Sequence, residues 1–294
     1  MRHRIVGSVF SMALAIAPPA IAQEAGEPDA DRDIVITGNV DVERQLTDFV
    51  GALTQAPGGG RLSRFETAVC PTVVGVPPAQ KDAVVARIRV VAKAAGLAVG
   101  GSRCVPNMLL VVTADKRAFL EALRRKHAYY FGEMSTSAVR KLIAAPGPAA
   151  AWQVDGPPLN ADGQAMATNN GVAVNRTTNR GSRLSEGARP QFAAAAVVVE
   201  SKALEGLTTT QLADYAAMRA FTSADPRKLP ASASTILTIL EAPMDSEVPI
   251  TMTTWDLAFL RSFYAAPPNL TAAAQRSQVR RGVKQELEKP GRGE

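Results

Sequence analysis

The side chains that could carry out chemistry are few in this sequence. Glu200, Glu205 and Asp214 lie near one another in the chain and could supply the two carboxylates of a glycosidase. Aromatic residues form only 5% of the chain, however, so a sugar groove of stacked rings is not expected. A Ser-His-Asp arrangement would have to use His127, which follows the run RRK at the predicted C-terminal end of a helix. A basic side chain at that position usually interacts favourably with the helix dipole instead of acting as a catalytic base. Neither G-x-S-x-G nor G-x-x-x-x-G-K-[ST] occurs, so no specific catalytic mechanism is favoured.

The first 22 residues have the layout of a signal peptide. Arg2 and Arg4 precede an apolar centre, and Ala20, Ile21 and Ala22 form a small-x-small cleavage site before Gln23. The alternative is an uncleaved N-terminal anchor. No later segment has about 18 uninterrupted apolar residues, so we expect the exported chain to be soluble and either periplasmic or secreted. The mixture of Ala, Arg, Gly and Pro is typical of a bacterial protein.

The chain has two cysteines, Cys70 and Cys104. A single pair of cysteines in an exported protein predicts a disulfide. The alternatives are a redox pair or thiolate ligands of a metal. A redox pair would usually have the C-x-x-C spacing, which is missing, and two cysteines without clustered histidines make a poor metal site.

The formal charge of +6 falls to +4 when Arg2 and Arg4 are removed with the signal peptide, leaving 31 basic against 27 acidic residues. This balance does not require nucleic acid as a partner. Two groups of basic residues stand out, and each is either solvated surface or a contact for anionic envelope polymers or lipid headgroups. They are Arg176, Arg180, Arg183 and Arg189 in a polar segment, and Arg276, Arg280, Arg281 and Lys284 near the end.

The hydrophobic pattern predicts an α+β fold with a mixed sheet. After a flexible leader at 23–33, an N-terminal α/β part at 34–155 should contain amphipathic helices and short strands. Its predicted strands are 33–38, 108–113 and 149–155, with a further strand region at 61–76, and its predicted helices are 40–55, 79–96, 116–127 and 135–144. The C-terminal part, 191–294, should place a buried strand at 192–201 before helices at 209–221, 253–266 and 271–287.

Residues 156–190 separate the two parts. They are poor in large apolar side chains and rich in Asn, Gly, Thr and Arg. We expect a long exposed loop with a weak hairpin around GVAVNR, or a mobile linker. Such a loop is a candidate binding surface or a simple excursion of the chain.

The stretches RLSRF, VTADK and WDLAFLRSFY, together with a strand before the helix in GLTTTQLADYAAMRAF, resemble a family of secreted proteobacterial proteins of unknown function. That family is similar in layout to the metzincin zinc metalloproteases, whose motif is H-E-x-x-H-x-x-G-x-x-H. The resemblance places five residues of this chain on the motif, and none keeps the required type. Thr210 replaces the first His, Gln211 the Glu, Asp214 the second His, Ala217 the Gly and Ala220 the third ligand.

A catalytic zinc needs about three protein ligands and a base, and His127 is the only histidine after the signal peptide. We therefore expect no metal and no cofactor, with Asp214 either a hydrogen-bonded core carboxylate or a relic of a polar site. The hypothesis is an exported, noncatalytic binding or envelope-associated protein whose partner is an envelope protein or polymer.

Two alternatives remain open. One is a hydrolase of an envelope polymer that works without zinc, through carboxylates or a Ser and Lys pair. The other is a periplasmic accessory of an outer-membrane transport system, because DIVITG at 33–38 resembles the short docking box of TonB-dependent receptors. The chain itself is too short for such a receptor's barrel.

Overall fold

The computed structural model describes residues 39–55, 61–170, 172–178, 181–182, 187–230, 233–243 and 246–289. The predicted signal peptide, leader and DIVITG strand lie outside these residues. Everything described belongs to one compact unit.

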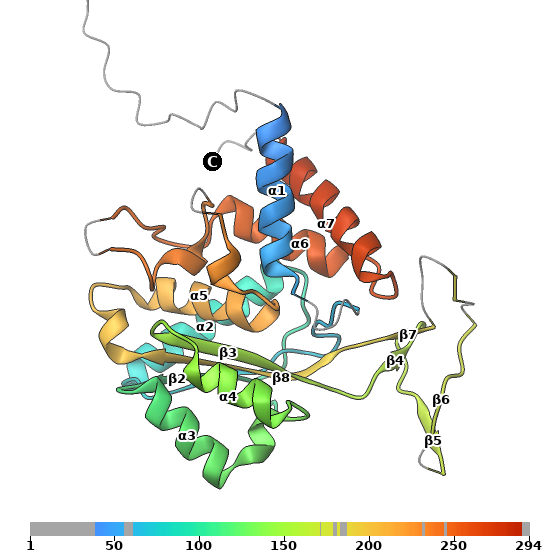
Figure 1. Ribbon diagram of the computed structural model, residues 1–294, viewed down its shortest axis with the longest axis horizontal. Helices are drawn as coiled ribbons and strands as arrows, with labels where there is room; N and C mark the ends of the chain where they lie inside the picture. The colour runs from blue at the N-terminus through green and yellow to red at the C-terminus, as the bar shows by residue number, and fades with distance from the viewer. Residues whose placement is uncertain are drawn as a thin grey trace, which may run out of the picture. The chain divides into compact units, whose positions relative to one another are not determined.

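A four-stranded mixed sheet forms the centre of the fold (Figure 1). Its strands, in spatial order, are β1 (Pro71–Val74), β2 (Met108–Thr113), β8 (Phe192–Glu200) and β3 (Ala149–Asp155). The first three run parallel, and β3 pairs antiparallel with β8. The predicted α+β class and mixed sheet are confirmed.

Helices cover both faces of this sheet, because side chains of alternate strand residues point to opposite sides. On one face, Val197 and Val199 of β8 pack in a larger core with five helices. On the other face, Val198 packs in a smaller core with two further helices. The larger core holds α1 (Asn39–Leu53), α2 (Pro78–Ala94), α5 (Thr209–Phe221), α6 (Thr254–Ala265) and α7 (Ala272–Leu287). The smaller holds α3 (Lys116–Lys126) and α4 (Thr136–Ala144). Residues from both predicted parts of the chain therefore share one core.

Local signals explain where several helices begin and end. The Asp115 carboxylate accepts a hydrogen bond from the Ala118 N–H at the start of α3, and Ser135 does the same for Ala138 in α4. Pro78 opens α2 at a position that needs no N–H donor. Gly96, at a φ of 84°, follows that helix, as its sequence predicts.

Helix α5 is buried on nearly all of its sides. Its residues from Gln211 to Met218 are all buried, as are Ala220 and Phe221. Four alanines in this helix allow α2, the sheet and the 3-10 helix η5 (Ile236–Thr238) to approach it closely. The apolar stretch TILTIL thus supplies a short 3-10 turn that covers α5.

The polar segment 156–190 carries short strands. They are β4 (Leu159–Asn160), β5 (Ala167–Asn169), β6 (Val172–Val174) and β7 (Ala188–Arg189). β5 and β6 form the hairpin expected around GVAVNR. Asn160 organises the segment, since its side chain accepts from the Asp162 and Gln164 N–H groups and donates to the Arg176 carbonyl.

The predicted disulfide is present. The sulfur atoms of Cys70 and Cys104 are bonded, with Cα atoms 6.0 Å apart. Among the described residues no helix is long and apolar enough to cross a membrane. Both features are compatible with an extracellular or periplasmic location.

Candidate functional site

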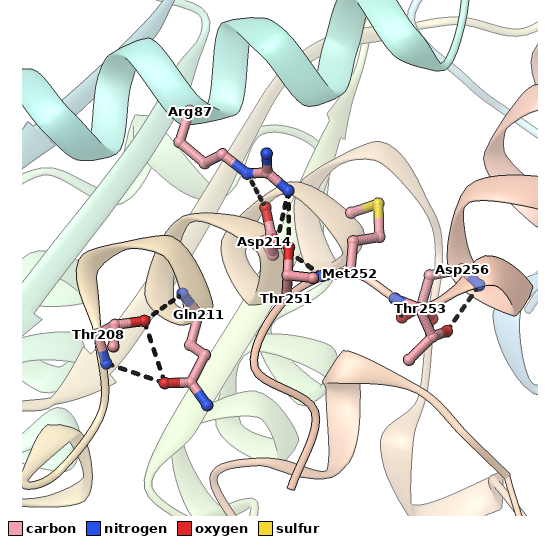
Figure 2. Close-up of polar contacts among 8 residues, drawn as sticks. All are labelled: Arg87, Thr208, Gln211, Asp214, Thr251, Met252, Thr253 and Asp256. Carbon is pink, nitrogen blue, oxygen red and sulfur yellow. Dashed lines mark hydrogen bonds and ion pairs between the residues drawn. The ribbon is translucent and has the colours of Figure 1, made fainter. Parts of the chain in front are cut away.

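The polar residues of α5 serve the fold itself. Thr208 and Gln211 form a capping box: the Gln211 N–H donates to the Thr208 hydroxyl, and the Thr208 N–H donates to Gln211 Oε1 at 2.9 Å (Figure 2). The other end of the Gln211 amide donates to the Pro249 carbonyl. Gln211, which stands at the general-base position of the zinc pattern, is therefore fully used in closing a helix end.

Asp214, at the second histidine position, is a buried carboxylate with four donors. Arg87 of α2 binds it in a bidentate manner at 2.6 and 2.9 Å, while the Thr251 hydroxyl and the Met252 N–H each donate at 2.7 Å (Figure 2). The hydrogen bond to Asp214 raises the pKa of Arg87. Asp214 thus joins α5, α2 and the segment before α6 as a hydrogen-bonded core carboxylate.

The remaining positions of the zinc pattern do not open onto a shared cavity. Ala217 and Ala220 are fully buried in the larger core, and Thr210 is half-buried in the first turn of α5. Within the described ranges, no three His, Cys, Asp or Glu side chains gather in a way that could hold a metal ion.

A second buried carboxylate, Asp256, was not singled out from the sequence. It forms another capping box with Thr253, and it also accepts from the Thr235 hydroxyl at 2.6 Å and the Ile236 N–H at 2.8 Å. Burial raises the pKa of Asp256, and these hydrogen bonds oppose the rise. The signal in the sequence was T-x-x-D before an apolar run, as T-x-x-Q was for α5.

The other candidate catalytic residues, Glu200, Glu205 and His127, do not form a shared site with Asp214. Glu200 accepts a hydrogen bond from the Lys116 N–H at the start of α3, and Glu205 is exposed. His127 ends α3 in an exposed position, with Tyr129 and Tyr130 beside its ring.

The predicted basic groups are partly engaged within the chain. Arg176 is exposed, whereas Arg189 lies in β7 and pairs with Glu66 at 3.3 Å, its side chain only 15% exposed. Arg180 and Arg183 lie outside the described residues. In α7, Arg276 donates to Thr54, Arg280 to Thr47 and Lys284 to Glu43, so these cations bind α1 and the residue after it.

A hollow with a volume of about 940 Å³ runs along the free side of β3, between α4 and the end of α5. Figure 1 shows β3 as a border strand of the sheet with α4 beside it. The hollow, here called the β3 groove, has Ala149, Ala151 and Gln153 along one side. Its volume falls in the range of ordinary ligand sites.

The register of β3 shows which backbone groups face this groove. The Glu200 N–H donates to the Pro148 carbonyl at 2.9 Å, so Pro148 and Glu200 are a hydrogen-bonded pair. Hydrogen-bonded pairs occur at every second residue of antiparallel strands. The backbone N–H and C=O groups of Ala150, Trp152 and Val154 therefore face β8. The N–H and C=O groups of Ala149, Ala151 and Gln153 therefore point into the groove.

The groove walls are fixed to one another. The Gln153 amide donates to the carbonyls of Arg219 and Thr222, both at 2.7 Å, which ties β3 to the end of α5. This satisfies carbonyls that the end of a helix leaves without partners.

Arg219 is the charged residue of α5 that lines the groove. One of its terminal nitrogens donates to the Tyr215 hydroxyl at 2.7 Å, and its guanidinium lies 5.7 Å from the centre of the Tyr215 ring. Burial raises the pKa of Tyr215, and the arginine opposes the rise. The Arg219 Nε has no hydrogen-bond partner among the described residues. A lone arginine in an alanine-rich helix was the available sequence signal.

More cations than carboxylates border the groove. Lys141 of α4 is exposed, and Lys228 donates to Gln55. Arg227 is paired with Asp225 at 2.9 Å. This wall can thus attract an acidic group.

Comparison with known proteins gives no relative: no family model, no curated protein and no solved structure matches the chain.

Proposed function

We propose that this exported chain is a noncatalytic binding protein that holds an extended polypeptide segment along the β3 groove. The supporting observation is the free edge of β3, whose outward backbone groups border a hollow rather than another strand. Unpaired edge strands bind extended peptides by adding a strand to the sheet.

Three successive outward residues set the length of the segment. Ala149, Ala151 and Gln153 each offer one N–H and one C=O, and together they span five residues of β3. At roughly 3.3 Å per residue, a ligand strand of about five residues would pair with them. The bulge between Val154 and Asp155 ends the regular register on one side.

Charge supports an acidic ligand. Arg219 lines the groove with its guanidinium group, and Lys141 stands on the α4 wall. A carboxylate accepts charge-assisted hydrogen bonds from such groups. The ligand class is therefore an extended peptide that carries at least one acidic side chain.

Selection of short random peptides displayed on phage against the exported chain tests the proposal. Ala151→Pro removes the central outward N–H, whereas Ala151→Ser keeps it as a matched control. We expect the proline variant to weaken the selected peptides about tenfold or more, and the serine variant to bind within about twofold of wild type. Thermal unfolding would verify that both variants are folded.

A second measurement leaves the protein unchanged. Two versions of a selected peptide are compared, one N-methylated at its odd-numbered residues and one at its even-numbered residues. Only one version should lose binding, because only every second ligand residue forms backbone hydrogen bonds with β3. Equal binding of both versions, or no peptide retained by the folded protein, would overturn the proposal.

A further inference from the structure

The end of α3 presents a patch that the groove proposal does not use. Residues 124–130, with the sequence RRKHAYY, are seven consecutive exposed residues that join α3 to the 3-10 helix η2 (Ala128–Phe131). We call them the RRKHAYY patch. Tyr129 is 69% exposed and Tyr130 46% exposed, which places them among the large side chains of the described chain left in solvent.

The fold holds these tyrosines outward. The next residue, Phe131, is buried and stacks on Trp152 of β3 with ring centres 5.1 Å apart. The Trp152 indole N–H donates to the Tyr130 carbonyl at 2.9 Å. Gly132 then turns the chain at a φ of 56°, where a side chain would meet Val154. The turn is anchored through Phe131, so burial of the two tyrosines is not needed to hold it.

The tyrosine rings form a pair with each other. Their centres are 4.4 Å apart and their planes are inclined by 31°, with the His127 ring edge-on to both. The patch is therefore a small amphipathic surface of adjacent rings with hydroxyl groups at their tips.

The patch is also cationic. Arg124 and Lys126 have no ion pair among the described residues, and Arg125 shares Glu121 with Arg117 at 3.8 and 3.7 Å. Cations at a helix C-terminus interact favourably with the helix dipole. This interaction gives a structural explanation for the presence of Arg124, Arg125 and Lys126 in the last turn of α3. That explanation does not extend to the two exposed tyrosines beside them.

We propose that the RRKHAYY patch docks this protein on the surface of an anionic phospholipid bilayer. Tyrosine is enriched at the level of the headgroups, where its ring and hydroxyl are both satisfied. Each basic side chain near an anionic surface strengthens binding about fivefold. Charge complementarity and the aromatic pair thus point to the same partner.

A planar partner suits this surface better than a polymer chain does. Residues 124–130 line neither the β3 groove nor the smaller hollow between α6 and α7. A polymer is usually held in a concave site, whereas a protruding helix end and turn can meet a flat surface. The inference is independent of peptide binding, because it uses different residues.

Cosedimentation with vesicles tests the proposal, using the exported chain without its signal peptide. The vesicles are equal parts of phosphatidylcholine and phosphatidylglycerol, compared with phosphatidylcholine alone, at low and high salt. We expect binding only to the anionic vesicles, and weaker binding at high salt.

Two variants of the patch and one control variant separate the contributions of the cations and of the tyrosines to vesicle binding. Removing the cations in Arg124→Ser/Arg125→Ser/Lys126→Ser should weaken binding about a hundredfold. Tyr129→Ser/Tyr130→Ser should weaken it about tenfold. Lys81→Ser/Arg103→Ser/Lys202→Ser removes the same charge from other exposed positions and should stay within about twofold of wild type.

Several results would overturn the proposal. They are no binding of the folded wild type to anionic vesicles, an equal loss in the control variant, or full binding by the tyrosine variant. Retention on an anionic polysaccharide without binding to vesicles would assign the patch to a polymer instead. Circular dichroism and thermal unfolding would show that each variant is folded.

Discussion

The two edge strands of the sheet, β1 and β3, differ in how many of their outward-facing N–H and C=O groups are free to bind another strand. At the β1 edge, the Cys70 carbonyl accepts from Met108 of β2, which turns the alternate residues Pro71 and Val73 outward. Pro71 has no N–H to offer. Val69, the preceding outward residue, already exchanges hydrogen bonds with Ala98 and Gly100. The β1 edge thus lacks one outward donor at Pro71, and the chain just before it is already paired.

The β3 edge has none of these protections at its centre. Its seven residues contain no proline, and three of them direct both backbone groups into the groove. Proteins usually block such edges with proline, charge or a covering element. This contrast supports the proposal that β3, and not β1, is the edge that binds a ligand. Changes near β1 should therefore alter stability without altering peptide binding, and changes near β3 should do the reverse.

The largest effect should come from the disulfide beside β1. Replacing both cysteines in Cys70→Ser/Cys104→Ser releases a closed loop with a sequence separation of 34. The chain-entropy argument gives a loss of about 4 kcal/mol in the free energy of unfolding. Urea unfolding of the variant and wild type measures this loss.

Peptide binding supplies the second half of that test. At a temperature where the variant is folded, the affinity of a selected peptide for the β3 groove should equal that of wild type. A parallel loss of binding would contradict the separation of the two edges.

The next effect concerns Arg87, which approaches α5 from the helix that covers β1. Arg87→Ala leaves the fully buried Asp214 carboxylate with only Thr251 and Met252 as donors. We expect a loss of about 2 to 3 kcal/mol, reduced from the usual cost of breaking a buried pair because the Arg87 side chain is 33% exposed. Thermal or urea unfolding measures it.

A matched control lies on the same helix. Lys93→Ala removes an exposed cation of α2 and should change the free energy of unfolding by no more than about 0.5 kcal/mol. Equal effects of the two substitutions would show that the bond to Asp214 contributes no net stability.

On the β3 side, Arg219→Gln should change binding more than stability. The Tyr215 hydroxyl loses a donor, which costs about 1 kcal/mol. Binding of an acidic selected peptide should fall about tenfold, because a charged donor is lost from the groove. Calorimetry with the peptide and with a version in which Gln replaces its acidic residue separates the two effects. Arg140→Gln, an exposed arginine of α4 outside the groove lining, makes the same charge change and should leave binding unaltered.

Much of the fold could be predicted because its signals are local. Asp115 and Pro78 mark helix starts in the sequence itself, and the β-branched run ending β8 indicates a strand covered on both faces. The disulfide followed from a single cysteine pair in a chain that is predicted to be exported. These features depend on neighbouring residues and on compartment alone.

The site depends on contacts between distant parts of the chain, which no local pattern contains. Asp214 could be recognised as a polar residue in an apolar helix, but its partner Arg87 lies 127 residues away. The segment AAAWQVD could be predicted as a strand, yet its place at the edge follows from pairing with β8 alone. The cap at Thr208, by contrast, is a local signal that the sequence itself contains.

The smallest effect should be a pH dependence at the entrance to β3. The Lys116 ammonium group donates to the carbonyls of Ala145 and Gly147, just before the strand begins. Burial lowers the pKa of Lys116 below its ordinary value of 10.5. Between the lowered pKa and 10.5 the unfolded chain binds more protons than the folded chain, so the lysine's contribution to stability increases with pH.

A comparison of wild type with Lys116→Met isolates this dependence, because methionine does not titrate. The difference in free energy of unfolding should shift in favour of wild type as the pH rises toward 10.5, by at most about 1.4 kcal/mol per pH unit, and should level off above it. A difference that stays flat or moves the other way would show that the folded protein does not disfavour the charged lysine. Since Lys116 fixes the turn before Ala149, the same variant should also bind the selected peptide more weakly, whereas the β1 variants should not.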